Sequence, residues 1–417
     1  MRDPSETMEV IVIGAGPAGL IAAYELGKQS INTVILEEHT KVGVPTSCAG
    51  LISISGLSRL GIRPPTSVIL NRVQGARFYS PSGKIIKIER STPQAYVVNR
   101  TGFDQYLAKR TKKEGAQILV GTRAIKIKLP NRDRAGYVEV LSYDLESESQ
   151  TKSYAKICID AEGCITRLLR QAGLSSPLKK NILPALQYEY QDVQDLDPTL
   201  VEVFTGLKIA PGFFAWMIPT GKDSVRVGLA CNSSYSPRRL LENLIRDSPI
   251  LNSRLRDAYR INQLGGRIPI TGPVKKTYTD NFLVIGDAAG QIKPTTGGGV
   301  IVGGLCAQIA GKTAAKAIQL ERYDAKMLSE YQQRWKSLLR KDLLAMKWAR
   351  LFFNTLEDSD IDRLFKQLAP SPIISNIKDN ADMDLQAKAI FTGLTQINLL
   401  DLFSLLPKAI LSILKCI

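Results

Sequence analysis

Two hydrophobic patterns alternate at the start of the chain. The run "MEVIVIGAGPAGLIAAYELGKQSINTVILEE", residues 8–38, begins with a short apolar β-rich stretch and passes through a glycine-rich turn. It continues with apolar residues spaced near 3.6, and a second β-rich stretch then ends in acidic residues. This order predicts a βαβ unit, in which a helix connects two parallel strands.

Further along the chain, apolar and polar residues alternate in short runs. The pattern occurs in "VQGARFYSPSGKIIKIE", residues 73–89, and between about 181 and 269, for example in "SVRVGLAC". Half-buried antiparallel strands have this alternation, so we expect these segments to form a sheet. From about 321 onward the spacing is helical, with basic residues along "RYDAKMLSEYQQRWKSLLRKDLLAMKWAR".

The glycine-rich turn has the spacing of a dinucleotide-binding fingerprint. Gly14 permits the tight turn, Gly16 lets the backbone approach a pyrophosphate, and Gly19 lets the helix pack on the strand, with Ala18 between them. The phosphates would then meet the positive N-terminus of the helix. Glu37, at the end of the second strand, is placed to accept hydrogen bonds from an adenosine ribose. Such a turn also occurs as plain structure, but strand, helix and terminal acid together favour a dinucleotide site.

A second motif indicates which dinucleotide is bound. The run "NFLVIGDAAGQIKPTTGGGVIVGGLCAQIAGKTAAKAI", residues 281–318, together with the early fingerprint resembles the para-hydroxybenzoate hydroxylase-like flavoproteins, which bind FAD. The resemblance implies that Asp287 contacts the ribityl chain and that the helix start at Gly298, Gly299 and Val300 faces the pyrimidine edge of the flavin. Helix N–H groups there would stabilise the negative charge of reduced flavin. The alternative is a glycine-rich helix start that only packs closely.

Two weaker motifs lie between these. "VVNRTGFDQYLAKRTKKEG" resembles the R-x-x-F-D-x-x-L helix of the same flavoproteins, which implies that Arg100 approaches the FAD phosphates. The following strand would bring the backbone near Ala124 to the adenine. In "KICIDAEGCITRLLRQAG", Glu162 stands where flavin hydroxylases carry the aspartate of A-D-G. That departure puts direct use of a pyridine nucleotide at this site in doubt.

These motifs and patterns predict an α/β fold with a discontinuous Rossmann-type FAD-binding domain, an inserted antiparallel β-sheet substrate domain and a C-terminal helical region. We assign residues 8–60, 96–180 and 270–320 to the FAD-binding domain and residues 61–95 and 181–269 to the substrate-binding domain. Residues 321–417 form the helical region, which is a candidate for membrane contact.

Composition narrows the chemistry. The formal net charge of +16 over 417 residues favours an anionic partner, which could be nucleic acid, acidic lipid or a phosphorylated substrate, and charge alone does not choose among them. The six cysteines are scattered and His39 is the single histidine, so we expect neither a metal site nor a Ser-His-Asp triad. No signal peptide is visible, and we expect a reducing, cytoplasmic setting. The chemistry is therefore expected to belong to the cofactor.

The stretch "VGVPTSCAG", residues 42–50, resembles the geranylgeranyl reductase family, especially its archaeal digeranylgeranylglycerophospholipid reductases, in its pattern G-x-P-x-x-C-x-G. A second family mark is "PGFFAWMIP", with Phe214, Trp216 and Pro219 on the substrate-facing sheet. The family usually has Tyr at the position of Phe214 and Phe at that of Ile218, and the stretch also approaches the W-x-W-x-I-P of flavin-dependent halogenases.

The resemblance implies that Cys48 and Ala49 lie beside the flavin and that the substrate is a polyprenyl lipid. An isolated isoprenoid double bond needs a proton as well as a hydride, and Cys48 is a candidate acid or relay. A bound water or Tyr96 is an alternative donor. Cys48 could equally be a small buried apolar residue in a tight turn, and Phe214 and Trp216 could be ordinary sheet core instead of the lining of a lipid tunnel.

We expect an FAD-dependent reductase that saturates geranylgeranyl chains, most simply on an ether-linked glycerophospholipid. The electron donor is left open between NAD(P)H and reduced ferredoxin, and no nucleic acid is expected as a partner. The terminal "LTQINLLDLFSLLPKAILSILKCI", residues 394–417, fits an interfacial anchor at the cytoplasmic face of a membrane or a helix packed on the protein itself. Two alternatives are a flavin monooxygenase or halogenase, and a membrane-surface flavoprotein that donates electrons to a quinone.

Overall fold

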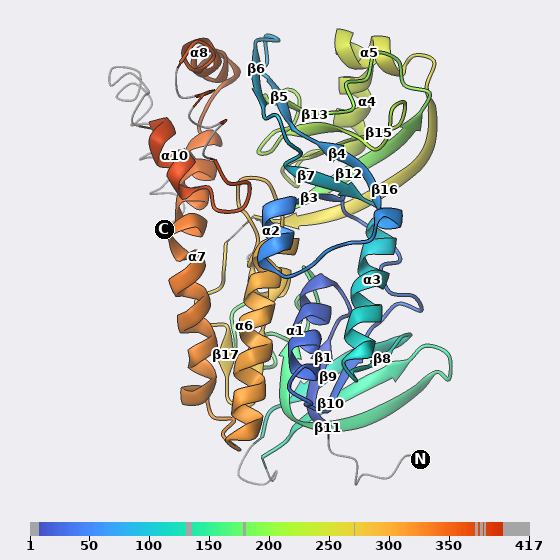
Figure 1. Ribbon diagram of the computed structural model, residues 1–417, viewed down its shortest axis with the longest axis vertical. Coiled ribbons are helices and arrows are strands. Elements are labelled where there is room, and N and C mark those ends of the chain that lie inside the picture. The colour runs from blue at the N-terminus through green and yellow to red at the C-terminus, as the bar shows by residue number, and fades with distance from the viewer. Residues whose placement is uncertain are drawn as a thin grey trace.

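The βαβ region and the antiparallel sheet that the sequence predicts lie at opposite ends of the molecule. The computed structural model describes residues 8–130, 136–177, 181–270, 272–371, 374–375, 378 and 381–394. Figure 1 shows one sheet at the lower end, with helices beside it, and a second sheet at the upper end, reached by strands that run between the two.

Eight of the described strands form the main sheet, in the order β17-β18-β11-β1-β2-β8 with β10 and β9 continuing from β11. β1 pairs in parallel with both β11 and β2. Its residues Val10, Ile11 and Val12 are fully buried, as expected of a central parallel strand covered on both faces. The strands span β1 Met8–Ile13, β2 Thr33–Leu36, β8 Gln117–Leu119, β9 Thr122–Lys128, β10 Val138–Asp144, β11 Ser149–Asp160, β17 Tyr278–Thr279 and β18 Phe282–Val284.

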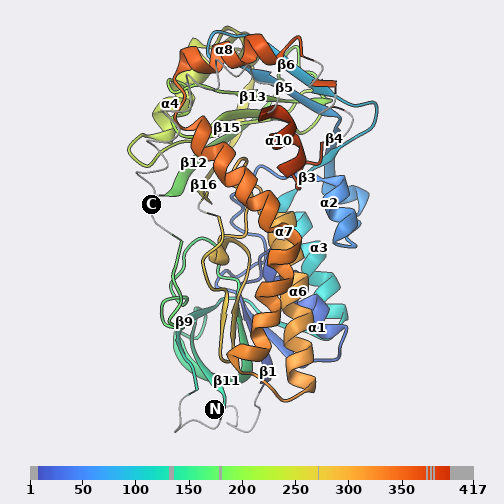
Figure 2. The ribbon, with the colours of Figure 1, turned by 90° about the vertical axis from the view of Figure 1, so that its left-hand side faces the viewer.

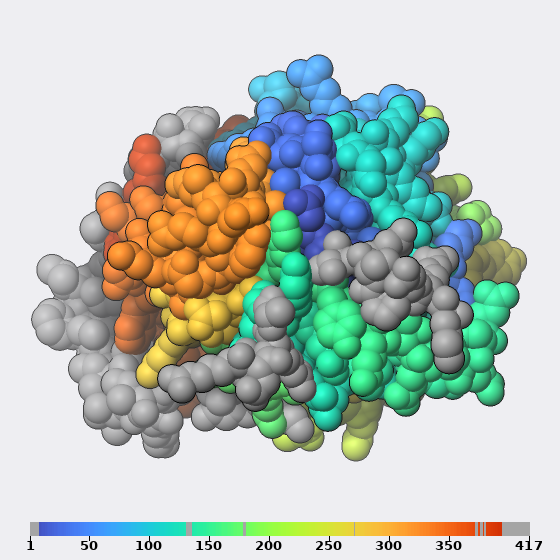
Figure 3. All heavy atoms as spheres, turned by 90° about the horizontal axis from the view of Figure 1, so that it is seen from below, coloured from blue at the N-terminus to red at the C-terminus, as the bar shows by residue number. Residues whose placement is uncertain are grey.

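Three helices pack together beside this sheet: α1 (Pro17–Gly27), α3 (Arg100–Lys113) and α6 (Val300–Gln319). α1 and α6 approach closely at Gly311, where an added Cβ would lie 2.6 Å from the carbonyl oxygen of Ala22. Viewed from below, the orange atoms of α6 and of α7 (Ala325–Phe353) lie against the blue atoms of α1, which in turn contact the teal atoms of α3 (Figure 3). The βαβ unit predicted from residues 8–38 is confirmed.

A second sheet holds seven of the described strands, in the order β16-β12-β15-β14-β13-β5-β6. Every neighbouring pair is antiparallel except β13 and β5. The predicted antiparallel sheet is therefore confirmed, with one parallel pair that the alternation pattern did not indicate. The strands span β5 Gly75–Tyr79, β6 Ile85–Glu89, β12 Ile182–Gln191, β13 Leu200–Phe204, β14 Ala215–Pro219, β15 Val225–Ala230 and β16 Tyr259–Pro269.

Short elements join the two sheets and cover the second one. β3 (Leu51–Ser53), β7 (Ala95–Val98) and β4 (Ile69–Val73) pair in a small antiparallel sheet, and β3 directly follows the stretch that contains Cys48. α4 (Pro237–Asp247) and α5 (Pro249–Leu255) pack on one face of the second sheet, with Leu241 and Leu251 fully buried. The remaining short elements are α2 Ile54–Arg59, η1 Thr66–Val68 and η3 Gly286–Ala289.

The C-terminal region is helical, as the spacing predicts. α7 (Ala325–Phe353) is the longest described helix and runs beside α6 from the main sheet toward the second sheet, where α8 (Asp358–Leu368) and α10 (Ala387–Leu394) lie (Figure 2). Within the described ranges, no helix combines the length and apolar character needed to cross a membrane. Residues 395–417, which carry most of the predicted interfacial segment, lie outside the described residues. The predicted fold class is confirmed.

Candidate functional site

The turn between β1 and α1 leaves no room for side chains at two of its three glycines. At Gly14, where φ is +96°, a Cβ would lie 2.5 Å from the carbonyl oxygen of Ala161, and at Gly19 it would lie 2.0 Å from the carbonyl oxygen of Gly14. At Gly16, by contrast, no atom lies within 4 Å of the position that a Cβ would take. The turn is therefore tightly packed on the protein side and open beside Gly16, as pyrophosphate binding requires.

The Glu37 carboxylate lies at the end of β2, buried against this turn. Its Oε2 accepts a hydrogen bond from the backbone N–H of Ala15 at 2.7 Å, and its Oε1 lies 2.6 Å from Nδ1 of His39. The backbone N–H of Thr122, at the start of β9, donates to the carbonyl oxygen of Glu37 at 2.8 Å. Ala124 is two residues further along that strand and is buried. These contacts bring the predicted ribose acid and the predicted adenine strand together.

The two glycine-rich motifs meet in space. The Cβ atom of Ala18 would lie 2.9 Å from a Cβ placed on Gly286, so α1 closely approaches the short helix that carries Asp287. Asp287 in turn faces the start of α6, since a Cβ on Gly299 would lie 2.6 Å from its Oδ1. Two sequence segments more than 250 residues apart therefore form one continuous site.

The start of α6 is suited to an anionic or electron-rich ligand. Gly299 is the residue preceding the helix, which begins at Val300 and follows Gly298, and as a glycine it provides no side-chain cap for the N–H groups of the first turn. The Asp287 carboxyl lies next to this turn. Burial raises its pKa to about 6, although the Arg100 cation lowers it. The open side of Gly16, the Glu37 carboxylate and this helix start together fit a flavin dinucleotide.

Arg100 joins Cys48 to the buried part of this site. Its Nη2 lies 3.1 Å from both carboxylate oxygens of Asp104, and the Cys48 side chain is close enough to interact electrostatically with its guanidinium. Burial opposes the charge of Arg100, but Asp104 and Cys48 raise its pKa above the ordinary value. Its Nε is buried and has no hydrogen-bond partner in the described part of the chain. Its approach to the FAD phosphates stays a prediction.

The stretch that carries Cys48 is held by an arginine from the second sheet. Arg226, on β15, donates from Nη1 to the carbonyl oxygens of Ala49 at 2.8 Å and Val98 at 3.1 Å. Its Nε donates to Oε1 of Glu189 at 2.7 Å. Nothing local in the sequence indicates this residue, because its partners are far away along the chain. Cys48 itself is partly exposed and accepts a long hydrogen bond, 3.4 Å, from the N–H of Gly50.

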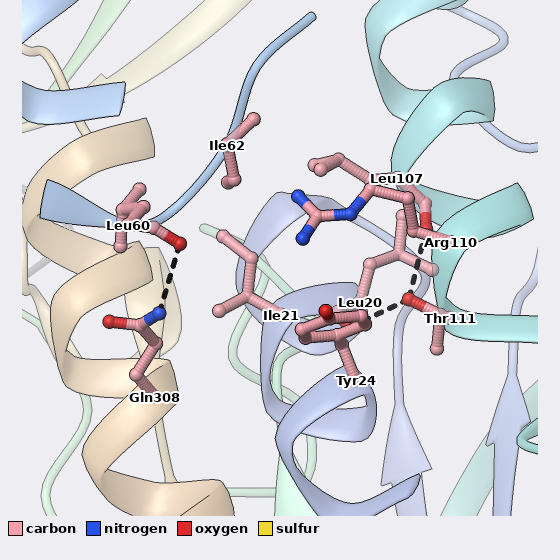
Figure 4. Close-up of a pocket in the computed structure, with 9 residues that line it drawn as sticks. All are labelled: Leu20, Ile21, Tyr24, Leu60, Ile62, Leu107, Arg110, Thr111 and Gln308. Atoms are coloured by element: carbon pink, nitrogen blue, oxygen red, sulfur yellow. Dashed lines mark hydrogen bonds between the residues drawn. The ribbon is translucent and has the colours of Figure 1, made fainter. Parts of the chain in front are cut away.

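One cavity near α1 lies apart from the candidate FAD site. It has a volume of about 10 Å³ and lies between α1, α3 and α6, where Figure 4 shows Tyr24 and Arg110 on one side and Leu60 and Gln308 on the other. A space of this size holds about one water molecule. It is therefore too small for an organic substrate.

Comparisons with known proteins identify the family. A model described as "FAD binding domain" matches residues 7–333. The digeranylgeranylglycerophospholipid reductase of Methanocaldococcus jannaschii is 34% identical over 394 residues, which is 94% of this chain and 97% of that protein. The chain belongs to the geranylgeranyl reductase family. The reductase of the same name from Methanococcus vannielii is 33% identical, over 87% of this chain and 91% of that protein.

Solved structures agree with this membership. A geranylgeranyl bacteriochlorophyll reductase-like protein from Thermoplasma acidophilum superimposes with a TM-score of 0.84 and 26% identity, covering 97% of this chain and 99% of that one. A halogenase crystallised with FAD, 17% identical with a TM-score of 0.67 and covering 94% of this chain and 86% of that one, shows the shared fold alone. This member of the geranylgeranyl reductase family is an FAD-dependent oxidoreductase and binds FAD.

The aromatic motif of this family member belongs to the apolar cluster against which Ala49 packs. The Phe213 and Phe214 rings stack with centroids 4.2 Å apart, and Phe214 meets Trp216 edge-on at 6.1 Å. Trp216 packs in an apolar cluster whose partly buried members include Ala49. Its Nε1 donates to Oε1 of Gln187 at 2.9 Å. Phe213, which was not predicted as a site residue, also belongs to this cluster.

Pro219 occupies a different position. It ends β14, where it pairs with Val225, and its carbonyl oxygen accepts a hydrogen bond from Nδ2 of Asn71 at 3.0 Å. It is buried, and its neighbour Ile218 belongs to the cluster that contains Trp216. Trp216 and Phe214 thus lie in the apolar cluster that the Cys48 stretch reaches through Ala49, and Pro219 ends the strand that carries Trp216.

A C-terminal segment closes the site from another side. Nζ of Lys293 donates to Oδ1 of Asp384 at 2.8 Å and to the carbonyl oxygen of Met383 at 2.9 Å. Asp384 also accepts a hydrogen bond from Ser53, the last residue of β3. Met383 packs against the apolar cluster of Trp216. Lys293 lies in the loop before α6, so this segment packs against the loop that leads to the predicted flavin site. The sequence gave no indication of these contacts.

The Glu162 position, which departs from the hydroxylase pattern, is turned inward. Oε1 of Glu162 accepts a hydrogen bond from the N–H of Leu168 at 2.9 Å, and burial raises the pKa of its carboxyl. The neighbouring Asp160 is fully buried, and burial together with the Glu162 charge raises its pKa well above the ordinary value. In the described part of the chain, no group of three or more His, Cys, Asp or Glu residues could hold a metal ion.

Proposed function

We propose that this protein is an FAD-dependent reductase that saturates C=C bonds of geranylgeranyl chains, on an ether-linked glycerophospholipid in membrane lipid biosynthesis. The observation that carries the proposal is that Ala49, next to Cys48, packs against the same apolar cluster that holds the aromatic residues Phe213, Phe214 and Trp216. An extended apolar chain bound in this cluster would reach the part of the site next to the flavin. The two methanogen relatives are named for this reaction class.

The chemistry assigns distinct tasks to the chain. An isolated prenyl double bond has no neighbouring carbonyl to accept charge, so a hydride at one carbon must be matched by a proton at the other. The hydride would be supplied by bound reduced FAD, which would be oxidised in the process. The proposed proton donor or relay is the partly exposed Cys48 thiol beside Arg100, with Tyr96 as the alternative. The N–H groups at the start of α6 would hold the negative charge of the reduced flavin.

The remaining site residues are proposed in the roles that their positions allow. The open backbone at Gly16 would receive the pyrophosphate, Glu37 would bind the ribose, and Asp287 would bind the ribityl chain. The proposed FAD-contacting set is Gly14, Gly16, Ala18, Gly19, Glu37, Cys48, Ala49, Arg100, Ala124, Asp287, Gly298, Gly299 and Val300, and the proposed lipid-contacting set is Phe214, Trp216 and Pro219.

We further propose that the protein acts at the cytoplasmic face of a membrane, where its lipid substrate resides. α7 exposes Leu338, Leu344 and Trp348 with exposed fractions of 49%, 42% and 48%. The formal charge of +16 would favour acidic headgroups. Electrons would come from NAD(P)H or reduced ferredoxin.

The test is product analysis under anaerobic conditions. The FAD-loaded enzyme is reduced chemically, incubated with digeranylgeranylglyceryl phosphate, and the lipid is examined by mass spectrometry. We expect a gain of two hydrogens for each double bond reduced. If product forms only with oxygen or halide, the protein is a monooxygenase or halogenase instead. If the reduced flavin passes electrons only to a quinone, the protein is an electron carrier instead.

A further inference from the structure

One buried arginine on α7 has no carboxylate partner among the described residues. Arg350 is 7% exposed, and its Nη2 donates to the carbonyl oxygen of Gly212. Its guanidinium carbon lies 4.3 Å from the centroid of the Phe213 ring. Its Nε is buried and has no hydrogen-bond partner among the residues that the structure describes. Burial lowers the pKa of Arg350 to about 9.

Other buried cations are compensated differently. Arg100 is paired with Asp104, Arg226 with Glu189 at 2.7 Å, and Lys293 with Asp384 at 2.8 Å. Over the described ranges, Arg350 is the buried cation without such an ion pair. A desolvated positive charge is unfavourable unless an anion or several hydrogen-bond acceptors compensate it. One carbonyl oxygen and one aromatic face supply only part of that compensation.

The position of Arg350 connects it to the proposed lipid site. The ring under its guanidinium, Phe213, stacks on Phe214 and belongs to the apolar cluster of Trp216. The Cζ atom of Phe213 lies 3.6 Å from the place that a Cβ on Gly297 would take, in the loop that leads into α6. The unpaired cation therefore lies at the edge of the aromatic surface that faces the flavin region.

We propose that Arg350 binds the phosphate group of the lipid substrate, with Phe213 and Phe214 contacting the first part of the prenyl chain. A guanidinium presents a planar pair of N–H donors that matches phosphate oxygens, and such a bond is stronger away from water. This assignment rests on the proposed function, because it presumes a prenyl lipid in the site. Free inorganic phosphate has the same recognition chemistry, and the test separates the two sources.

The experiment compares two ligands with the same chain, geranylgeranyl phosphate and geranylgeraniol, by calorimetric titration of the oxidised FAD-loaded enzyme. We expect Arg350→Met to weaken binding of geranylgeranyl phosphate by about 10- to 100-fold and to leave geranylgeraniol unchanged. Arg340→Met removes the same charge from an exposed position on α7 and is the matched control, with no expected change. FAD content and thermal unfolding are measured on each variant.

Three outcomes would overturn the assignment. These are equal weakening for both ligands, no weakening for either ligand, or competition by inorganic phosphate without any effect of the variant on the lipid phosphate. If Arg350→Met does not fold, Arg350→Lys keeps the charge but loses the fork of N–H donors. We then expect a smaller loss that is again confined to geranylgeranyl phosphate, and a loss shared with geranylgeraniol would overturn the site.

Turnover separates this assignment from the proposed reaction. Because binding is measured with oxidised enzyme, a phosphate preference that depends on Arg350 supports the site even if no double bond is reduced, which would reject the reductase alone. Conversely, reduction of both ligands with no preference for the phosphate would reject the site and leave the reductase standing.

Discussion

The FAD-binding half and the substrate-facing half of the site are built in different ways. In the turn after β1, Gly14 meets Gly19 and Ala15 meets Glu37 within one βαβ unit, and the backbone of Ala161, directly after β11, closes the turn from the neighbouring strand. In the substrate-facing half, the Ala49 carbonyl is held by Arg226, 177 residues away. The first half is determined by backbone geometry and steric exclusion, and the second by side chains that arrive from distant parts of the chain.

This difference predicts how each half responds to mutation. Changes in the turn act through steric overlap with the backbone, which cannot relax without moving a strand or helix. Changes in the substrate-facing half act through lost hydrogen bonds and unpaired charges, which weaken the packing of one sheet on the other. The two halves can therefore be separated experimentally.

The largest effect is expected at Gly19. Gly19→Val places side-chain atoms on the carbonyl oxygen of Gly14, so we expect loss of about 3 kcal/mol or more of unfolding free energy and loss of FAD binding. Gly16→Val is the matched variant, because its Cβ meets open space. It should leave the stability of the flavin-free protein within about 1 kcal/mol and still abolish FAD binding. Thermal unfolding and flavin fluorescence check both, and equal destabilisation by the two variants would contradict the steric account.

The next largest effect is expected at Arg226. Arg226→Met removes the donors to Ala49 and Val98 and breaks the ion pair with Glu189, which should cost about 3 kcal/mol of unfolding free energy. Urea unfolding measures the change. Arg246→Met, which breaks an exposed ion pair with Asp247, is the control and should have no measurable effect. Similar midpoints for the two variants would show that Arg226 does not hold the sheets together.

A smaller, pH-dependent effect is expected at Asp287. Because burial raises its folded pKa to about 6 from an unfolded value of 3.8, the folded state binds the extra proton and stability falls as pH rises between these values. The full penalty, up to about 3 kcal/mol, is present above pH 6 and absent below the unfolded pKa. Asp287→Asn should therefore stabilise the flavin-free protein at pH 8 but not at pH 3.5. A stability difference independent of pH would exclude this titration.

The smallest effect is expected at Cys48. Cys48→Ala should retain FAD and slow alkene reduction by at least about tenfold, since a positioned acid contributes to proton transfer. Cys231→Ala, in the core of the second sheet, is the cysteine control and should leave the rate unchanged once folded. A rate for Cys48→Ala equal to that of the native enzyme would shift the proton-donor role to Tyr96 or water, and Tyr96→Phe would then be measured.

The sequence predicted the βαβ unit and the fold class correctly because their determinants are local. The spacing of Gly14, Gly16 and Gly19 and the acid at the strand end are visible within one βαβ unit. In the substrate-facing region a site could be predicted only where a short motif exists, at Cys48 and Trp216, and the roles of these residues stay predictions. Arg226, the Lys293–Asp384 pair and Arg350 were not predicted, because a charged residue in a strand or helix looks the same whether it faces solvent or a buried carbonyl.

The pattern also left the sheet topology open. Alternation of apolar and polar residues identifies a half-buried strand but not its neighbour, so the parallel pairing of β13 with β5 could not be derived. That pairing joins two segments more than 100 residues apart and brings residues 75–79 into the same sheet as the aromatic motif.

The central claim is that the prenyl double bond itself takes electrons from the flavin, and anaerobic stopped-flow absorbance tests it most directly. Chemically reduced enzyme is mixed with digeranylgeranylglyceryl phosphate, and the oxidised-flavin band is followed over time. The account predicts that the band returns at a rate that rises with lipid concentration and matches the appearance of reduced lipid. A flavin that stays reduced with every prenyl lipid, yet reoxidises with oxygen or a quinone, would contradict it.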